Sequence, residues 1–222
     1  MKYCALFALG LLALTGCSST QKNSTEQAYM IIDIKGDSSI RENVLDTVVE
    51  TVQESMDTLT VSRGIPPFEL PEKPTRFKLV NPYGNSGIGA LVQSHGGMVM
   101  IPTCQDPILT MKSDDSTEGF GESTSFFICV VQYQQGYHVD IYTTFNQSSG
   151  GISIDAMSAS LARSLVGDTS QIIPRTMKRI ELALSEENYE TRVVDSYIPK
   201  KWKGAFIDET TVTATKGDNS KL

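Results

Sequence analysis

Apolar and polar residues follow regular patterns along much of the chain, and these patterns predict its strands and helices. Tyr29–Lys35 is rich in β-branched and apolar residues, which is typical of a strand. A helix is expected next, because apolar residues recur at every fourth position from Ile40 to Met56. Either Asp37 or Ser38 can cap the N-terminus of this helix.

The same four-residue spacing predicts a pair of helices nearer the C-terminus. Apolar residues line one helix face from Ile154 to Leu165, and Gly167 is placed to end that helix as a left-handed cap. Pro174 suits the first turn of the next helix, which continues inward to Leu184. A last strand is expected at Thr191–Ile198.

The middle of the chain reads as short strands and turns. Prolines between Gly64 and Pro74 exclude a regular helix or a central strand there and predict a surface loop. Strands are expected at Arg76–Val80 and Met98–Thr103, the second after a turn at Gly96-Gly97. The acidic stretch Lys112–Thr124 is interpreted as a mobile hairpin loop.

One hairpin is clearer than the other elements. Its strands are Ser125–Tyr133 and Tyr137–Phe145, and a three-residue loop at Gln134–Gly136 would place Gly136 in the left-handed conformation. In that register Cys129 lies on a buried face of the sheet.

Together these elements predict an α+β fold. We expect a mainly antiparallel, twisted sheet, with the early helix and the later helix pair packed on one face. A chain of 222 residues suits one hydrophobic core. We place this single domain at residues 28–207 and expect a disordered polar tail at 208–222, where large apolar residues are few.

The N-terminus has a different pattern. Lys2 supplies a positive charge, and the apolar run Ala5–Leu14 stops at Thr15, before a strongly polar segment. A membrane-spanning helix needs about 20 apolar residues, so this run is too short. Residues 1–16 are therefore expected to be a signal peptide that is removed after export.

The residues that close this segment, Leu14-Thr15-Gly16-Cys17, resemble the lipobox of bacterial lipoprotein precursors. In that family the cysteine is acylated with chains such as palmitate, and cleavage makes it the first residue. The resemblance implies that lipidated Cys17 anchors the protein in the bacterial cell envelope. Ser18, rather than Asp, follows the cysteine, which favours the outer membrane, facing the periplasm. Residues 17–27 are then a lipidated cysteine and a flexible, polar tether.

The remaining cysteines fit this envelope location. Cys4 leaves with the signal peptide and Cys17 carries lipid, which leaves Cys104 and Cys129 as a pair in an oxidising compartment. We predict a disulfide between them. A catalytic thiol or a metal ligand is disfavoured, because the chain has no Cys-x-x-Cys motif and only two histidines.

The charge of the chain bears on its partners. The net charge is −7, and loss of Lys2 makes it −8. An acidic surface argues against nucleic acid as a partner and against a second, electrostatic attachment to anionic lipid. Contact with the membrane is therefore expected through Cys17 alone, and no metal or cofactor is expected.

Candidate chemistry is sparse. The glycine-rich run Gly84–Gly89 lacks both the Gly-Lys-Ser/Thr ending of a P-loop and the spacing of a nucleophile elbow. His138 and Asp140, two apart on one strand, could act as general base and orienting group or as two metal ligands. With no third partner in the sequence, an exposed polar strand face is favoured, and no catalytic residue is assigned.

Two classes of function follow from these observations. The favoured one is a non-enzymatic interaction, assembly or inhibitor module, anchored to the membrane and bound to a protein partner in the cell envelope. The alternative is a small-molecule-binding protein or a hydrolase whose site combines His95, His138, Asp140 and a serine. The alternative predicts a concave pocket beside these residues.

Overall fold

The computed structural model describes residues 22–56, 58–84, 100–117, 122–149 and 172–200. The 3-10 turn Ser38–Ile40 precedes the first helix. The helices and strands, in chain order, are β1 (Lys22–Lys35), α1 (Arg41–Gln53), β2 (Thr60–Arg63), β3 (Lys78–Val80), β4 (Ile101–Thr103), β5 (Leu109–Thr117), β6 (Glu122–Tyr133), β7 (Gly136–Ser149), α4 (Ile172–Glu186) and β8 (Thr191–Tyr197).

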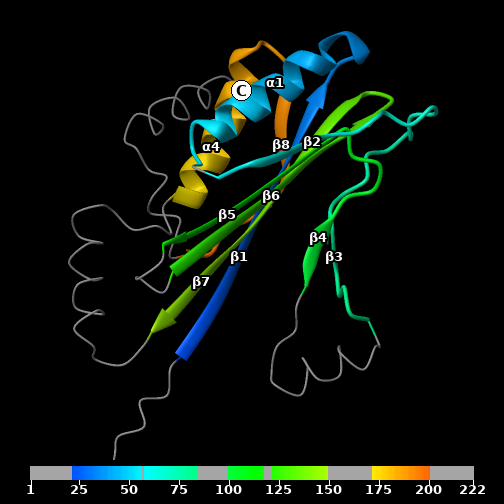
Figure 1. The fold of residues 1–222 in the computed structure, drawn as a ribbon. Coiled ribbons are helices and arrows are strands. Elements are labelled where there is room, and N and C mark those ends of the chain that lie inside the picture. Colours follow the sequence, from blue (N-terminus) through cyan, green and yellow to red (C-terminus); the bar gives the residue numbers. More distant parts are fainter. Residues whose placement is uncertain (1–21, 57, 85–99, 118–121, 150–171, 201–222) are drawn as a thin grey trace, which may run out of the picture.

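Six of these strands form one antiparallel sheet in the order β2-β5-β6-β7-β1-β8. Helices α1 and α4 pack against each other and cover one face of the sheet, which is twisted (Figure 1). Strands β3 and β4 form a separate antiparallel pair beside the other face. The α+β fold with a mainly antiparallel, twisted sheet is thereby confirmed.

The helix-covered face of the sheet holds the main core. Because side chains alternate along a strand, β1 sends every second residue from Ala28 to Ile34 toward the helices. The apolar stripe of α1 packs there as its spacing predicts, and Asp37 accepts a hydrogen bond from Ser39 N before the helix begins. The buried apolar residues that the helices contribute to this core cluster are Val44, Leu45, Val48, Val52, Ile173, Met177, Ile180 and Leu184.

The second face of the sheet is also covered. Phe77 and Leu79, from the β3 region, and Cys104, directly after β4, pack on Phe127, Cys129 and Tyr142 of the large sheet. A disulfide joins Cys104 to Cys129, as the cysteine content predicts. The sheet is therefore buried on both sides over much of its length.

The predicted register of the β6–β7 hairpin is wrong by one residue. The turn contains only Gln134 and Gln135, and Tyr133 pairs directly with Gly136. Gly136 has φ +154, and a Cβ there would collide with the carbonyl oxygen of Ile34 in β1, so the neighbouring strand favours glycine at this position. Cys129 is buried as expected, but it faces Asp140 across the hairpin.

Two predicted loops are strands in part. The expected tether, residues 17–27, is wrong for 22–27, because these residues extend β1 and pair with the far end of β7. Likewise, most of Lys112–Thr124 belongs to β5 and β6, which pair as far as Thr117 and Glu122. Backbone pairing with a long neighbouring strand outweighs a polar composition that disfavours strands.

Several sequence predictions lie outside the described residues. They are the signal peptide 1–16, Cys17, the helix expected from Ile154 to Gly167, and the tail 208–222. The glycine-rich run from Asn85 onward, His95 and the Gly96-Gly97 turn belong to the same group. No helix among the described residues is both long and apolar enough to cross a membrane.

Candidate functional site

A cluster of buried polar side chains lies on the second face of the sheet, beneath residues 75–77, which lead into β3. We call these residues the covering segment. Asp33 comes from β1, Tyr133 from the end of β6, and His138 and Asp140 from β7. All four are less than 9% exposed. The prediction that His138 and Asp140 form an exposed strand face is therefore wrong, because a covering segment lies over them.

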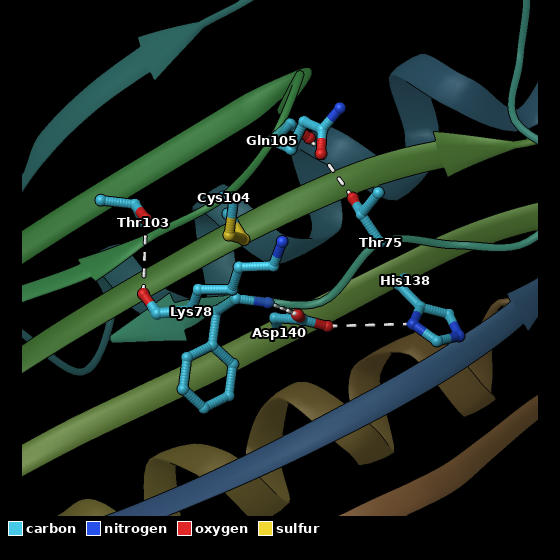
Figure 2. Close-up of a disulfide and its surroundings, with 9 residues drawn as sticks. Thr75, Lys78, Thr103, Cys104, Gln105, His138 and Asp140 are labelled. Carbon is cyan, nitrogen blue, oxygen red and sulfur yellow. Dashed lines mark hydrogen bonds and ion pairs between the residues drawn. A yellow bond between two sulfur atoms is a disulfide. The ribbon is translucent and has the colours of Figure 1, made fainter. Parts of the chain in front are cut away.

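The covering segment is attached to the sheet at several points. Phe77 N donates a hydrogen bond of 2.6 Å to Asp140 Oδ2, and the disulfide fixes the chain after β4 (Figure 2). Arg76 forms an ion pair of 2.8 Å with Asp195 of β8. Thr75 Oγ1 also donates to the carbonyl of Gln105, which follows β4. These contacts hold the segment over the polar cluster and keep water from much of it.

Asp33 is the centre of the polar cluster. Tyr133 OH donates a hydrogen bond of 2.7 Å to its Oδ1, and Lys35 Nζ lies 3.1 Å from its Oδ2. Lys35 Nζ also donates to the oxygen of Tyr133 at 2.5 Å, and this hydrogen bond raises the pKa of Lys35. Asp33 is thus a buried carboxylate with both a charged and a neutral donor, which offsets much of its desolvation cost.

His138 lies between two carboxylates. Its Nε2 is 3.5 Å from Asp33 Oδ1, and its Nδ1 is 3.9 Å from Asp140 Oδ1 (Figure 2). Burial nevertheless lowers the pKa of His138 to about 4, partly opposed by the charge of Asp33, so the imidazole is neutral at pH 7. A neutral imidazole has one N–H, so it can donate to only one of the two carboxylates.

Burial moves the pKa of Asp140 in the opposite direction, because here the charged form is the deprotonated one. Desolvation raises the pKa of this carboxyl to about 6, although the N–H of Phe77 and the charge of Arg76 favour the ionised form. Among the described residues, neither Asp140 Oδ1 nor His138 Nδ1 has a hydrogen-bond partner, and both atoms are buried. The two atoms face each other, so a small movement that shared a proton between them would satisfy both.

A pocket of about 300 Å³ opens beside Asp33 and His138. Its floor is formed by the sheet, and one wall is formed by the end of the proline-rich loop, Gly64–Pro74. The lining residues are Asp33, Lys35, Glu72, Lys73, Pro74, Tyr133, Gln135, His138, Arg192 and Val194. This size falls at the lower end of the range of small-molecule sites.

The structure brings together only part of the site expected for a hydrolase. His138 and Asp140 lie side by side, and His138 lines the pocket. His95 falls outside the described residues. Among the described residues that line the pocket there is no serine, threonine or cysteine, so the serine that this hypothesis needs is not one of them.

Sequence reasoning missed Asp33, Tyr133 and Lys35. One signal for Asp33 is present in the sequence, since it is the only acid within the apolar strand Tyr29–Lys35. A charge in such a strand points to a buried partner. Tyr133 could not be recognised as that partner, because the predicted turn placed it on the wrong face relative to His138.

Potential metal ligands also come together on this face of the sheet. One ligand atom each from Cys104, Cys129 and Asp140 lies within 4.8 Å of the other two. Both sulfur atoms belong to the disulfide, so they offer no thiolate to a metal in this state. These three residues therefore bring a buried carboxylate next to a disulfide, and we do not assign a metal site to them.

A second feature with functional interest is the proline-rich segment itself. Ile65 is 90% exposed and Phe68 is 102% exposed, while the chain around them is fixed by Pro66 and Pro67. The end of the segment is attached to the β6–β7 turn, because Gln134 N and Nε2 donate to the carbonyl groups of Pro71 and Leu70. Two large apolar side chains are thus presented to solvent from a stiffened loop.

A scan against protein-family models and a search of curated proteins found no match to this chain.

Proposed function

We propose that this chain is a lipid-anchored envelope protein that binds a protein partner through its proline-rich loop, Gly64–Pro74. The protein is a non-enzymatic interaction module in this proposal. Lipidated Cys17 attaches one end of the domain to the membrane, most simply the outer membrane, and the loop contacts the partner at the other end. The lipobox residues and the exposed side chains of the loop support the two halves of the proposal.

The position of the anchor supports this division. Only residues 18–21 separate Cys17 from the start of β1 at Lys22. The five residue steps from Cys17 to Lys22 span at most about 18 Å, so in this proposal the beginning of β1 stays close to the bilayer. The domain is therefore tethered more tightly than the sequence pattern suggests.

The loop lies at the opposite end of the sheet. β1 runs from Lys22 to Lys35, and Lys35 pairs with Gly136 beside the turn to which the loop is attached. Fourteen residues of strand span about 45 Å. Figure 1 shows the segment between β2 and β3 at the end of the sheet where β1 finishes. A surface so far from the anchor is suited to a protein in the periplasm and not to the anchoring membrane.

The observation that carries the proposal is the complete exposure of Phe68. Burying a phenylalanine side chain stabilises a protein or a complex by about 1.5–3 kcal/mol, and aromatic side chains are common at the centres of interfaces. Pro66 and Pro67 restrict the loop before binding, so less conformational entropy is lost when a partner buries Phe68. Ile65 supplies a second apolar contact from the same loop.

Photocrosslinking in living cells tests the proposal. A photoreactive phenylalanine analogue replaces Phe68, and a matched variant carries the analogue at Leu182 of α4, which is 47% exposed. We expect one discrete protein adduct from position 68, none from position 182, and loss of the first adduct with Ile65→Ser. No protein adduct at position 68, the same adducts at both positions, or crosslinks to lipid alone would contradict the proposal.

A specific observation favours a second candidate function, the binding of a small molecule. His138 and Asp33 lie at a pocket, which is the concave site that the alternative hypothesis predicts. The neutral imidazole of His138 is a polar group at this pocket that can hydrogen-bond to a ligand. Binding of a ligand at this pocket is compatible with an interaction module, since the pocket and the loop share the end of the proline-rich segment.

A further inference from the structure

We propose that the pocket beside Arg192 binds a small organic molecule through its carboxylate group. This proposal rests on the second candidate function, the binding of a small molecule, and the site shares only the end of the proline-rich loop with the docking surface around Phe68. It is argued from the charges and the shape of the pocket. Arg192 and Lys73 supply the binding groups for the carboxylate. Pro74 and Val194 contact the organic part of the ligand.

The buried acid at the floor of the pocket does not need a cationic group of the ligand to balance its charge. This acid, Asp33, already contacts Tyr133 OH at 2.7 Å and Lys35 Nζ at 3.1 Å. His138 Nε2 approaches the same carboxylate at 3.5 Å. The charge of Asp33 is therefore compensated within the protein, and a cationic ligand would have to displace Lys35.

The cations at the mouth of the pocket are free to bind an anion. Neither Lys73 nor Arg192 forms an ion pair with any residue that the structure describes, whereas Arg63 and Arg76 are both paired. Arg192 pairs in register with Asp33 across β1 and β8, so both side chains lie on the pocket face of the sheet. A guanidinium can bind a carboxylate through two parallel hydrogen bonds.

The balance of charge in the pocket differs from that of the whole chain. Three basic residues line it, Lys35, Lys73 and Arg192, against the two acids Asp33 and Glu72. The chain as a whole has a net charge of −7. A locally positive pocket on an acidic protein selects an anion and holds it against the general repulsion of the surface.

The walls and the size of the pocket favour an organic anion over a bare inorganic one. Pro74 and Val194 bring apolar surface into a space of about 300 Å³. A phosphate ion would leave this apolar surface in contact with water. A molecule with a short aliphatic chain and one carboxylate would cover it and place its charge at Arg192.

Isothermal titration calorimetry with the full-length protein, purified from membranes in detergent, tests the inference. The probe is 4-methylpentanoate, and the matched neutral compound is 4-methylpentanamide. We expect the carboxylate to bind in the micromolar to millimolar range and the amide at least tenfold more weakly. Inorganic phosphate, as a third titrant, should bind at least tenfold more weakly than the carboxylate.

Variants assign the binding to this pocket. Arg192→Gln and Lys73→Gln should each weaken carboxylate binding at least fivefold, whereas Arg179→Gln on α4 and Lys78→Gln on β3 should leave it within twofold. All four side chains are on the surface, and an unchanged melting temperature checks the fold of each variant. Equal weakening by the control variants, equal binding of carboxylate and amide, phosphate binding as tight as carboxylate binding, or no binding of the carboxylate would each overturn the inference. Because these measurements leave Phe68 untouched, they are independent of the photocrosslinking result.

Discussion

His138 and Asp140 are buried side by side, and burial moves their pKa values in opposite directions. For Asp140 the folded pKa, about 6, exceeds the ordinary value of 3.8, so its protonated form favours folding and this contribution is lost as the pH rises toward 6. For His138 the folded pKa, about 4, is below 6.5, so its contribution is present at higher pH and is lost as the pH falls toward 4. Between about pH 4 and pH 6 these two changes in the free energy of unfolding have opposite signs and largely cancel.

Single substitutions should expose each effect. With Asp140→Asn, the free energy of unfolding should rise between pH 4 and 6.5, because only His138 still titrates there. With His138→Gln it should fall between pH 4 and 6. Each pKa differs from its ordinary value by about two tenfold steps of 1.4 kcal/mol, so each change is roughly 3 kcal/mol.

Urea unfolding at several pH values measures both variants. Other acidic groups affect both variants alike, so the quantity to compare is the difference between the two pH slopes. Parallel slopes would show that burial does not perturb the two groups as described.

The disulfide is a second test at the scale of single residues. It closes a loop with a sequence separation of 25, so replacing both cysteines, Cys104→Ala with Cys129→Ala, should lower the free energy of unfolding by about 3 kcal/mol. Reducing the wild-type protein should produce a similar loss. If reduction has no effect while the double variant is unstable, the loss comes from the cavity left by Cys129 and not from the released cross-link.

Individual buried charges were the hardest feature to predict from the sequence. The spacing of His138 and Asp140 correctly placed both on one strand face, but the sequence offered no sign that a distant segment would cover that face. Phe77, whose N–H binds Asp140, lies 63 positions away in the chain. Contacts of this kind depend on the packing of the whole fold and leave no local pattern.

At the scale of elements, α4 offers a direct comparison of buried and exposed positions. Ile180 is completely buried in the core between α4 and the sheet, and Leu182 is 47% exposed on the same helix. Ile180→Ala should lower the free energy of unfolding by about 2–5 kcal/mol, and Leu182→Ala by less than about 0.5 kcal/mol. Chemical denaturation measures both. Similar losses for the two variants would contradict the packing of this helix.

The proline-rich loop should behave differently from the core. Phe68→Ser should leave the free energy of unfolding within about 0.5 kcal/mol of the wild-type value, since Phe68 contributes no buried surface to the fold. The same variant should lose the protein partner. A large fall in stability would mean that Phe68 packs within the domain, and its role as a docking residue would then have to be abandoned.

The helices α1 and α4 were predicted better than the turn of the β6–β7 hairpin. The stripes of α1 and α4 are long and regular, so their spacing identifies both helices, and Pro174 lies in the first turn of α4 as expected. The β6–β7 register failed because the choice between a two-residue and a three-residue turn depends on Gly136. That choice is set by the neighbouring strand β1, where Ile34 O leaves no room for a side chain.

At the scale of the whole molecule, the fold places the start of β1 and the proline-rich loop at opposite ends of the sheet. The α+β class followed from alternating strand and helix patterns, but β2 and β5 were missed. β5 carries acidic and small residues that resemble a loop, and β2 is a short, exposed edge strand. Strand order could not be predicted, because pairing is decided by contacts between distant segments.

The proposed docking role of the loop depends on lipidation of Cys17, because the distance of the loop from β1's start matters only if that start is held at a membrane. Intact mass spectrometry of the protein extracted from cell membranes tests this lipidation. We predict a chain that begins at Cys17 and carries the added mass of its acyl groups, with Cys17→Ser giving an unlipidated, unprocessed product. A mature chain that retains Met1–Gly16, or one in which Cys17 is unmodified, would show that the protein is not lipid-anchored at Cys17.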